Sequence, residues 1–160
     1  MRTHFKTILL LSLLFLAFTV KPQGDINYHH VKGYHFIGEE SEKSDIFLII
    51  HNEKEWRNFF KPYPGHYVKE VTNIDWNKYI AVGIIKYGNH AWAMQAKRVE
   101  LDEGELSFEY VSQKTDEGLV WKNATPLVVL IPKGKYKALR YIENSILVRK
   151  FENFTGKRDF

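Results

Sequence analysis

The chain has 160 residues, of which 44% are hydrophobic and 15% aromatic, and it contains no cysteine, which excludes disulfides, thiolate metal sites and lipid attachment through an N-terminal cysteine. Three of the 23 basic residues but none of the 19 acidic ones lie within positions 1–23, so 20 basic residues face 19 acidic ones in the rest of the chain. With basic and acidic residues so nearly balanced, this part of the chain has little excess positive charge to attract nucleic acid, and we expect it not to bind nucleic acid.

The N-terminus has the pattern of a secretory signal. Arg2 and Lys6 precede an uncharged apolar run over residues 8–20. As a helix this run is about 20 Å long, shorter than the hydrocarbon core of a bilayer. We therefore expect residues 1–23 to be a signal peptide cleaved between about residues 19 and 24, and residues 24–160 to form one exported domain in the periplasm or outside the cell. Contact with a membrane is expected only through an uncleaved signal segment.

Three of the seven histidines lie in the stretch YHHVKGYHF, residues 28–36, which is predicted to be an ordinary first strand. In a strand, the adjacent His29 and His30 point to opposite faces, and His29 and His35 lie about 20 Å apart. Zinc ligands must converge on one ion, so the strand cannot build a metal site by itself. We expect no metal and no cofactor. A site completed by His51, His66 or His90 is the alternative.

Three short runs are apolar at consecutive positions, which predicts central strands covered on both faces. They span residues 46–50, 79–85 and 127–131. In contrast, residues 105–112 alternate apolar and polar side chains, which predicts a strand with one solvated face. Residues 101–106 before it form a hairpin turn, with Gly104 available for a positive φ. Residues 131–136 and 142–146 are predicted to be further turns between strands.

One helix is predicted, in the segment HNEKEWRNFFKP at residues 51–62. Asn52 can cap it, Glu55 has the position of a capping-box partner, and Pro62 closes it. Its aromatic stripe, from Trp56 to Phe60, is expected to pack on a sheet. The predicted fold class is therefore α+β: a single domain of largely antiparallel β-sheet with one well-capped helix packed on it.

Catalytic motifs are missing from the sequence. It has no G-x-S-x-G elbow, no H-E-x-x-H pair and no phosphate-binding glycine loop. Its acidic clusters at residues 102–105 and 116–117 fall in turns, where solvation explains them. We expect no catalytic residues and no enzyme. An undetected hydrolase with two convergent carboxylates is the alternative.

Aromatic residues in loops are the unusual feature. They suit a binding scaffold, because loops carry function and rings contribute interface energy, although they also suit caps on a small core. The residues predicted to contribute to binding are Tyr63, His66, Tyr67, His90 and Trp92.

The order of segments over residues 45–135 resembles the C-terminal-like domain of the protease-complex subunit PrcB family of exported bacterial proteins. The resemblance is carried by Glu55–Trp56, Asp75–Trp76, Gly88 and the I-P-K sequence at 131–133. The family usually follows its glycine with a T-G-G-Y-like turn, whereas this chain has GNHAWAM. The resemblance implies a non-catalytic accessory protein that stabilises or binds an exported protease or another envelope protein. The alternative is a module that binds a small ligand or a glycan through exposed aromatic loops.

Overall fold

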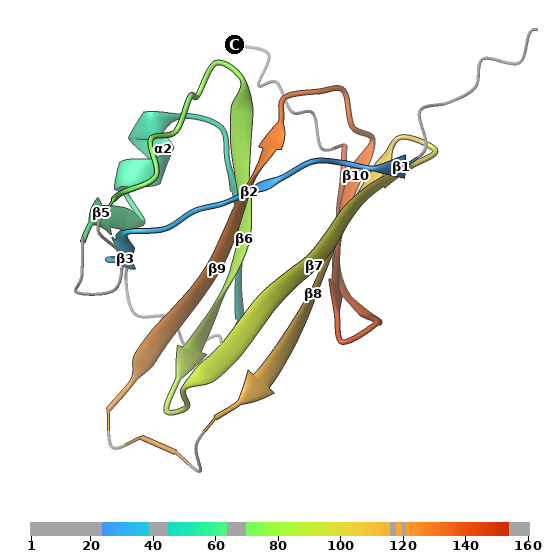
Figure 1. Cartoon of the computed structure of the whole chain (residues 1–160). Helices are drawn as coiled ribbons and strands as arrows, with labels where there is room; N and C mark the ends of the chain where they lie inside the picture. The colour runs from blue at the N-terminus through green and yellow to red at the C-terminus, as the bar shows by residue number, and fades with distance from the viewer. Residues whose placement is uncertain (1–23, 39–44, 64–69, 116–117, 120, 154–160) are drawn as a thin grey trace, which may run out of the picture.

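The structure is a computed structural model that describes residues 24–38, 45–63, 70–115, 118–119 and 121–153 (Figure 1). The predicted signal peptide, His66 and Tyr67 lie outside these residues. The described elements are β1 (Gly24–Asp25), β2 (His29–His30), β3 (Tyr34–Phe36), β4 (Asp45–Ile50), α2 (Glu53–Arg57), β5 (Phe60–Pro62), β6 (Tyr79–Gly88), β7 (Trp92–Asp102), β8 (Glu105–Lys114), β9 (Asn123–Pro132), β10 (Ala138–Glu143) and β11 (Ile146–Glu152).

Two sheets pack face to face, so the domain is mainly β rather than α+β. The five-stranded sheet has the order β1-β7-β8-β10-β11, and the four-stranded sheet has the order β2-β9-β6-β4. All neighbours pair antiparallel except β8 and β10, which are parallel because the chain crosses to β9 in the other sheet between them. A ribbon of β3 and β5 and the helix α2 form a third layer at one side (Figure 1).

The four-stranded sheet is apolar on both faces because it separates two cores. One core fills the space between the sheets and includes Val82, Ile84 and Val129. The other lies under α2 and the β3–β5 ribbon and includes Ile50, Ile85 and Leu130. The prediction of strands covered on both faces is confirmed for all three runs. One detail is wrong: β4 lies at the edge of its sheet and not at the centre.

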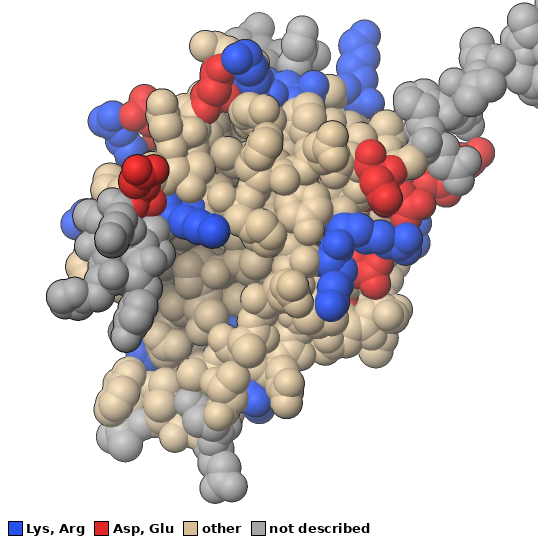
Figure 2. Space-filling view, in the orientation of Figure 1, with Lys and Arg blue, Asp and Glu red and all other residues tan. Residues whose placement is uncertain are grey.

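The five-stranded sheet has one solvated face, as its alternation predicts. Leu106, Phe108 and Tyr110 are fully buried between the sheets. On the outer face, Arg98 Nε lies 2.7 Å from a Glu109 carboxylate oxygen and Lys150 Nζ lies 2.8 Å from one of Glu105. Figure 2 shows the edge of the sandwich crossed by β1 and β2, where acidic and basic side chains mix around a largely uncharged centre. This face shows no continuous basic stripe.

The predicted hairpin turn at 101–106 and the predicted turn at 142–146 are both confirmed. Glu103 and Gly104 join β7 to β8 with φ of 48° and 85°, and Asn144 and Ser145 join β10 to β11 with φ of 49° and 67°. Two consecutive positive φ angles are typical of the tight turns that match the twist of paired strands. The predicted turn at 131–136 also lies between strands, where β9 ends before β10 begins.

The predicted first strand over residues 28–36 is wrong, because the segment is divided between two sheets. β2 pairs with β9, whereas β3 pairs with β5. The chain bends between them at Gly33, which has φ of 79° and packs so closely that a Cβ would lie 2.8 Å from Val71 Cα. Only glycine adopts this conformation freely at such a contact.

The helix is confirmed in position but is shorter than predicted. The side chain of Asn52 accepts a hydrogen bond from the Glu55 N–H at 2.9 Å, and the Glu55 carboxylate accepts one from the His51 N–H at 2.9 Å. The helix ends at Arg57, since Phe60 pairs with Phe36 in the β3–β5 ribbon. No helix in the described part of the chain is long and apolar enough to cross a membrane.

Candidate functional site

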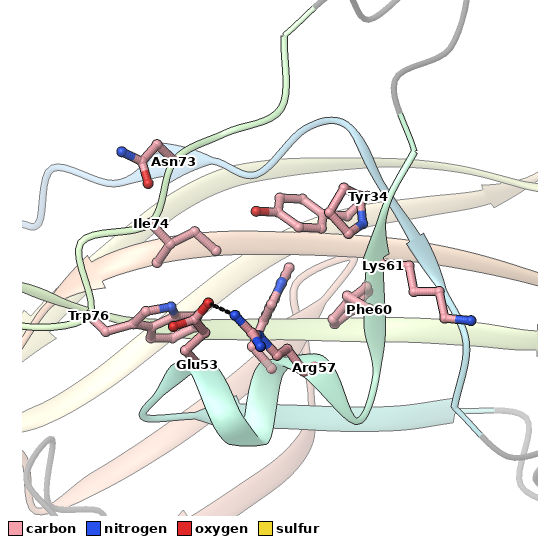
Figure 3. Close-up of a pocket in the computed structure, with 10 residues that line it drawn as sticks. Tyr34, Glu53, Arg57, Phe60, Lys61, Asn73, Ile74 and Trp76 are labelled. Atoms are coloured by element: carbon pink, nitrogen blue, oxygen red, sulfur yellow. Dashed lines mark hydrogen bonds and ion pairs between the residues drawn. The ribbon is translucent and has the colours of Figure 1, made fainter.

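A cavity of about 550 Å³ lies between α2, β5 and the segment that leads into β6 (Figure 3). We call it the aromatic pocket. Its size falls within the usual range for sites that bind small ligands or single side chains. It is lined by Tyr34, Glu53, Trp56, Arg57, Phe60, Lys61, Pro62, Asn73, Ile74 and Trp76.

Four rings from three segments form the pocket, with Trp56 at their centre. Phe60 stacks on Trp56 at 4.1 Å between centroids, Tyr34 meets it edge-on at 5.0 Å, and Trp76 lies tilted at 5.9 Å. Trp56 and Phe60 are buried, while Tyr34 and Trp76 are half-buried. Together these rings form a concave apolar surface.

Hydrogen bonds fix the wall of the pocket opposite α2. Thr72 exchanges two bonds with the backbone of Lys32, at 2.9 and 3.0 Å, and its carbonyl accepts a third from the Tyr34 hydroxyl at 3.0 Å. Asp75 then accepts the N–H of Asn77 at 3.1 Å and starts the turn that leads into β6. Trp76 is therefore carried on an anchored turn. Burial, and then the Glu53 carboxylate, raise the pKa of Tyr34, so its hydroxyl stays protonated near neutral pH.

The indole N–H of Trp56 is a polar group without a partner in this apolar setting. Only 3% of the residue is exposed, and no described group accepts a hydrogen bond from its Nε1. A buried donor left unpaired costs about 1–3 kcal/mol. Packing therefore holds the Trp56 side chain in place. Its contacts with the neighbouring rings must outweigh the cost of the unpaired N–H.

The rim of the pocket carries charge. Arg57 Nη2 lies 2.5 Å from a Glu53 carboxylate oxygen, and both side chains are mostly exposed. Figure 3 shows this ion pair rising from α2 beside Trp76, whereas the Lys61 and Asn73 side chains point away from it. The site thus offers an apolar surface next to one acceptor and one donor. Such a surface can hold an apolar group and pair with polar atoms beside it.

A second cluster, which we call the ionic cluster, closes one end of the space between the sheets. The Lys86 ammonium is nearly buried and lies 2.8 Å from carboxylate oxygens of both Asp45 and Glu143. Glu143 also accepts hydrogen bonds from the Tyr110 hydroxyl, at 3.2 Å, and from the Ser112 hydroxyl. This cluster joins β4, β6, β8 and β10 through one cation and two anions.

The two carboxylates of the ionic cluster converge, as hydrolase chemistry would require, but the environment of Glu143 does not suit a general acid. Burial alone would raise the pKa of Glu143, yet hydrogen bonds from Lys86 and Ser112 and the charge of Lys86 hold it below its ordinary value. A general acid needs a raised pKa so that it carries a proton near neutral pH. The lysine also occupies the space between the two carboxylates.

The histidines and loop aromatics of the sequence prediction are dispersed. His29 contacts the Tyr79 ring, His30 contacts Tyr28, and His35 contacts Tyr63. Within the described ranges no three His, Asp or Glu side chains are grouped so that they could hold a metal ion.

The predicted binding residues do not meet in one site. Trp92 is half-buried at the ionic cluster, with its ring 5.0 Å from Lys86 Nζ and 5.6 Å from Lys114 Nζ. His90 lies in the connection just before it. Tyr63 is 67% exposed next to β5, well apart from the start of β7 in Figure 1, and does not line the aromatic pocket.

The sequence interpretation missed Tyr34, Ile74 and Trp76 as site residues and favoured packing over ligand binding for Trp56. One signal was available: Trp56 and Trp76 both occur in the segments that carry the family resemblance. A scan against protein-family models, a search of curated proteins and a search of solved structures each gave no match to this chain.

Proposed function

We propose that this protein is a non-catalytic binding protein that holds an apolar side chain of a partner polypeptide in the aromatic pocket. The observation that carries the proposal is the pocket itself: four rings line a cavity of about 550 Å³. Interface energy concentrates where one large apolar group enters such a concave site.

The rim favours a polypeptide as the partner. Every peptide unit beside a side chain presents one N–H donor and one C=O acceptor. The Glu53 carboxylate can accept from the first and the Arg57 guanidinium can donate to the second, and both side chains are exposed. We further propose that the protein is exported and that its partner is an exported protease or another envelope protein, as the N-terminal sequence and the family resemblance suggest.

Binding of a saccharide is the second candidate function. Tyr34 and Trp76 are half-buried rings beside a carboxylate and a guanidinium, a set of groups that can stack on a sugar and bond its hydroxyls. This version uses the aromatic pocket and not the loop rings Tyr63, Tyr67 and Trp92.

Selection of peptides from a random library displayed on phage tests the proposal. Wild-type protein should enrich peptides that share an apolar residue, and Trp76→Ala should lose their binding. Trp92→Ala, which truncates another half-buried tryptophan outside the pocket, is the control and should retain it. Enriched peptides that bind Trp76→Ala as well as wild type would refute the proposal. Binding on a glycan array that only Trp76→Ala abolishes would favour the second candidate.

Charge variants at the rim refine the same test. Glu53→Gln and Arg57→Gln should each weaken binding of the selected peptides. Because both groups are exposed, the loss of binding free energy should be about 1 kcal/mol or less. Lys78→Gln removes another exposed ion pair, with Asp75, and should leave the affinity unchanged.

A further inference from the structure

The charged side chains that line the aromatic pocket do not balance. Glu53 is acidic, whereas Arg57 and Lys61 are basic, so one negative and two positive charges give the lining a net charge of +1. Lys61 is exposed and has no ion-pair partner within the described part of the chain. Asp75 and Lys78, in the turn before β6, pair with each other at 3.2 Å and add no net charge. The pocket therefore favours a ligand that brings one negative charge beside its apolar group.

The Arg57 guanidinium is placed to meet that charge. It lies at the rim beside Trp76 (Figure 3), and its hydrogen bond to Glu53 uses only Nη2. A guanidinium carries five N–H donors in a planar fork, so Nε and Nη1 can donate to a second carboxylate. Because the pair with Glu53 is exposed, it contributes little and can reorient at small cost. A ligand carboxylate can therefore join Arg57 without displacing Glu53.

This charge distinguishes between the parts of a polypeptide that could enter the pocket. An internal segment brings no backbone charge and would leave the lining at +1, and a terminal ammonium would raise the total to +2. A C-terminal carboxylate would bring the total to zero. A chain end also needs only one way into a site that α2, β5 and the segment before β6 bound on three sides (Figure 3).

We propose that the partner enters the aromatic pocket with its C-terminal residue, whose large apolar side chain lies against Tyr34 and Trp76 and whose terminal carboxylate pairs with Arg57. Tyr34 and Trp76 are the half-buried rings of the pocket, and an aromatic side chain gains most from contact with them. The N–H of the same residue donates to Glu53. This inference rests on the proposed function and specifies which part of the partner is bound.

Four matched peptides test the proposal. The first is acetyl-Gly-Ser-Gly-Phe with a free carboxylate, and in the second that carboxylate is an amide. In the third, Gly-Ser follows the phenylalanine, and the fourth ends in Phe-Asp-amide, which moves the charge to a side chain. The indole N–H signal of Trp76 in 15N-labelled protein reports binding. The free acid should bind about fivefold more tightly than each of the others, as expected for an exposed ion pair.

Variants of the protein assign the preference to Arg57. Arg57→Gln should reduce the ratio of acid to amide affinity from about fivefold to about twofold or less. Lys78→Gln changes the net charge by the same unit outside the pocket lining, so it is the matched control and should keep the full ratio. Both side chains are mostly exposed, and thermal melts verify that the variants fold.

Three results would overturn the inference: an amide or a Phe-Asp peptide that binds as tightly as the free acid, a ratio unchanged in Arg57→Gln, or a free acid that does not shift the Trp76 signal at millimolar concentration. The proposed function fails in a different way. If acid and amide bind alike and Trp76→Ala abolishes both, the pocket still holds an apolar side chain and only the role of the terminal carboxylate is wrong. Binding that Trp76→Ala leaves intact would refute both.

Discussion

The rings of the aromatic pocket and the charges of the ionic cluster both close an apolar core, but they leave different surfaces behind. The ionic cluster is drawn together by contacts of 2.8 Å on Lys86, and Glu143 accepts further bonds from two hydroxyls. The aromatic pocket keeps a cavity and an unpaired indole N–H. The first arrangement holds four strands together, whereas the second leaves a surface that a ligand can complete. Substitutions of the buried residues Trp56 and Lys86 should therefore lower stability, whereas substitution of the half-buried Trp76 in the pocket should mainly lower binding.

The largest effect is expected from Trp56→Ala. Truncating a buried ring loses transfer free energy and leaves a cavity, so the free energy of unfolding should fall by about 3–5 kcal/mol. Trp56→Phe should cost less, because it keeps an aromatic ring, leaves a smaller cavity and removes a donor that has no partner among the described groups. Urea denaturation measures both variants. Equal losses for the two would contradict the account of Trp56 as a ring held by packing.

Lys86→Met should destabilise the protein by about 3 kcal/mol, because it leaves Asp45 and Glu143 facing each other without their cation. Adding Glu143→Gln to this variant should recover part of the loss. Lys150→Met, which breaks two ion pairs on the outer face of the sheet, is the control and should cost about 1 kcal/mol or less. Denaturant melts in which Lys86→Met matches Lys150→Met would show that the ionic cluster does not hold the strands together.

The ionic cluster should also make stability depend on pH. The pKa of Glu143 is lowered in the folded protein, so its contribution is complete above the ordinary carboxyl pKa of about 4.3 and is lost as the pH falls through the folded value. Thermal melts between neutral and acidic pH should show a steeper decline for wild type than for Glu143→Gln. If the melting temperatures of the two proteins fall in parallel, Glu143 is excluded as the source of this pH dependence.

The smallest of these effects is expected from the helix cap. Asn52→Ala removes the hydrogen bond to the Glu55 N–H and should cost about 1 kcal/mol. The same urea denaturation used for Trp56 measures it. If Asn52→Ala lowers the free energy of unfolding more than Trp56→Ala does, the account of α2 as a short helix that supports Trp56 is contradicted.

The features that could be predicted from the sequence are those set by neighbouring residues. The Asn52 cap, the turns at Gly104 and Asn144 and the doubly covered strand β6 all follow from local patterns. The division of residues 28–36 between two sheets could not be predicted, because it depends on how closely Val71 approaches Gly33. The end of α2 depends likewise on the pairing of Phe60 with Phe36.

Both candidate clusters lie beyond local patterns. Lys86 is 41 residues from Asp45 and 57 from Glu143, and nothing in the sequence around any of them marks the ion pairs. The aromatic pocket assembles Tyr34, Trp56 and Trp76 from three separate segments. The sequence identified aromatic loops as candidates for binding, but it could not show which rings meet.

The most direct test of the binding proposal uses the indole N–H resonances of the four tryptophans. Protein labelled with 15N at tryptophan gives one signal each for Trp56 and Trp76 in the aromatic pocket, for Trp92 at the ionic cluster and for Trp121 in an exposed connection, assigned by substitution. Titration with a peptide from the phage selection should shift the signals of Trp56 and Trp76 and leave those of Trp92 and Trp121 in place. Shifts confined to Trp92 or Trp121 would contradict the account and place the binding surface at the other end of the sandwich.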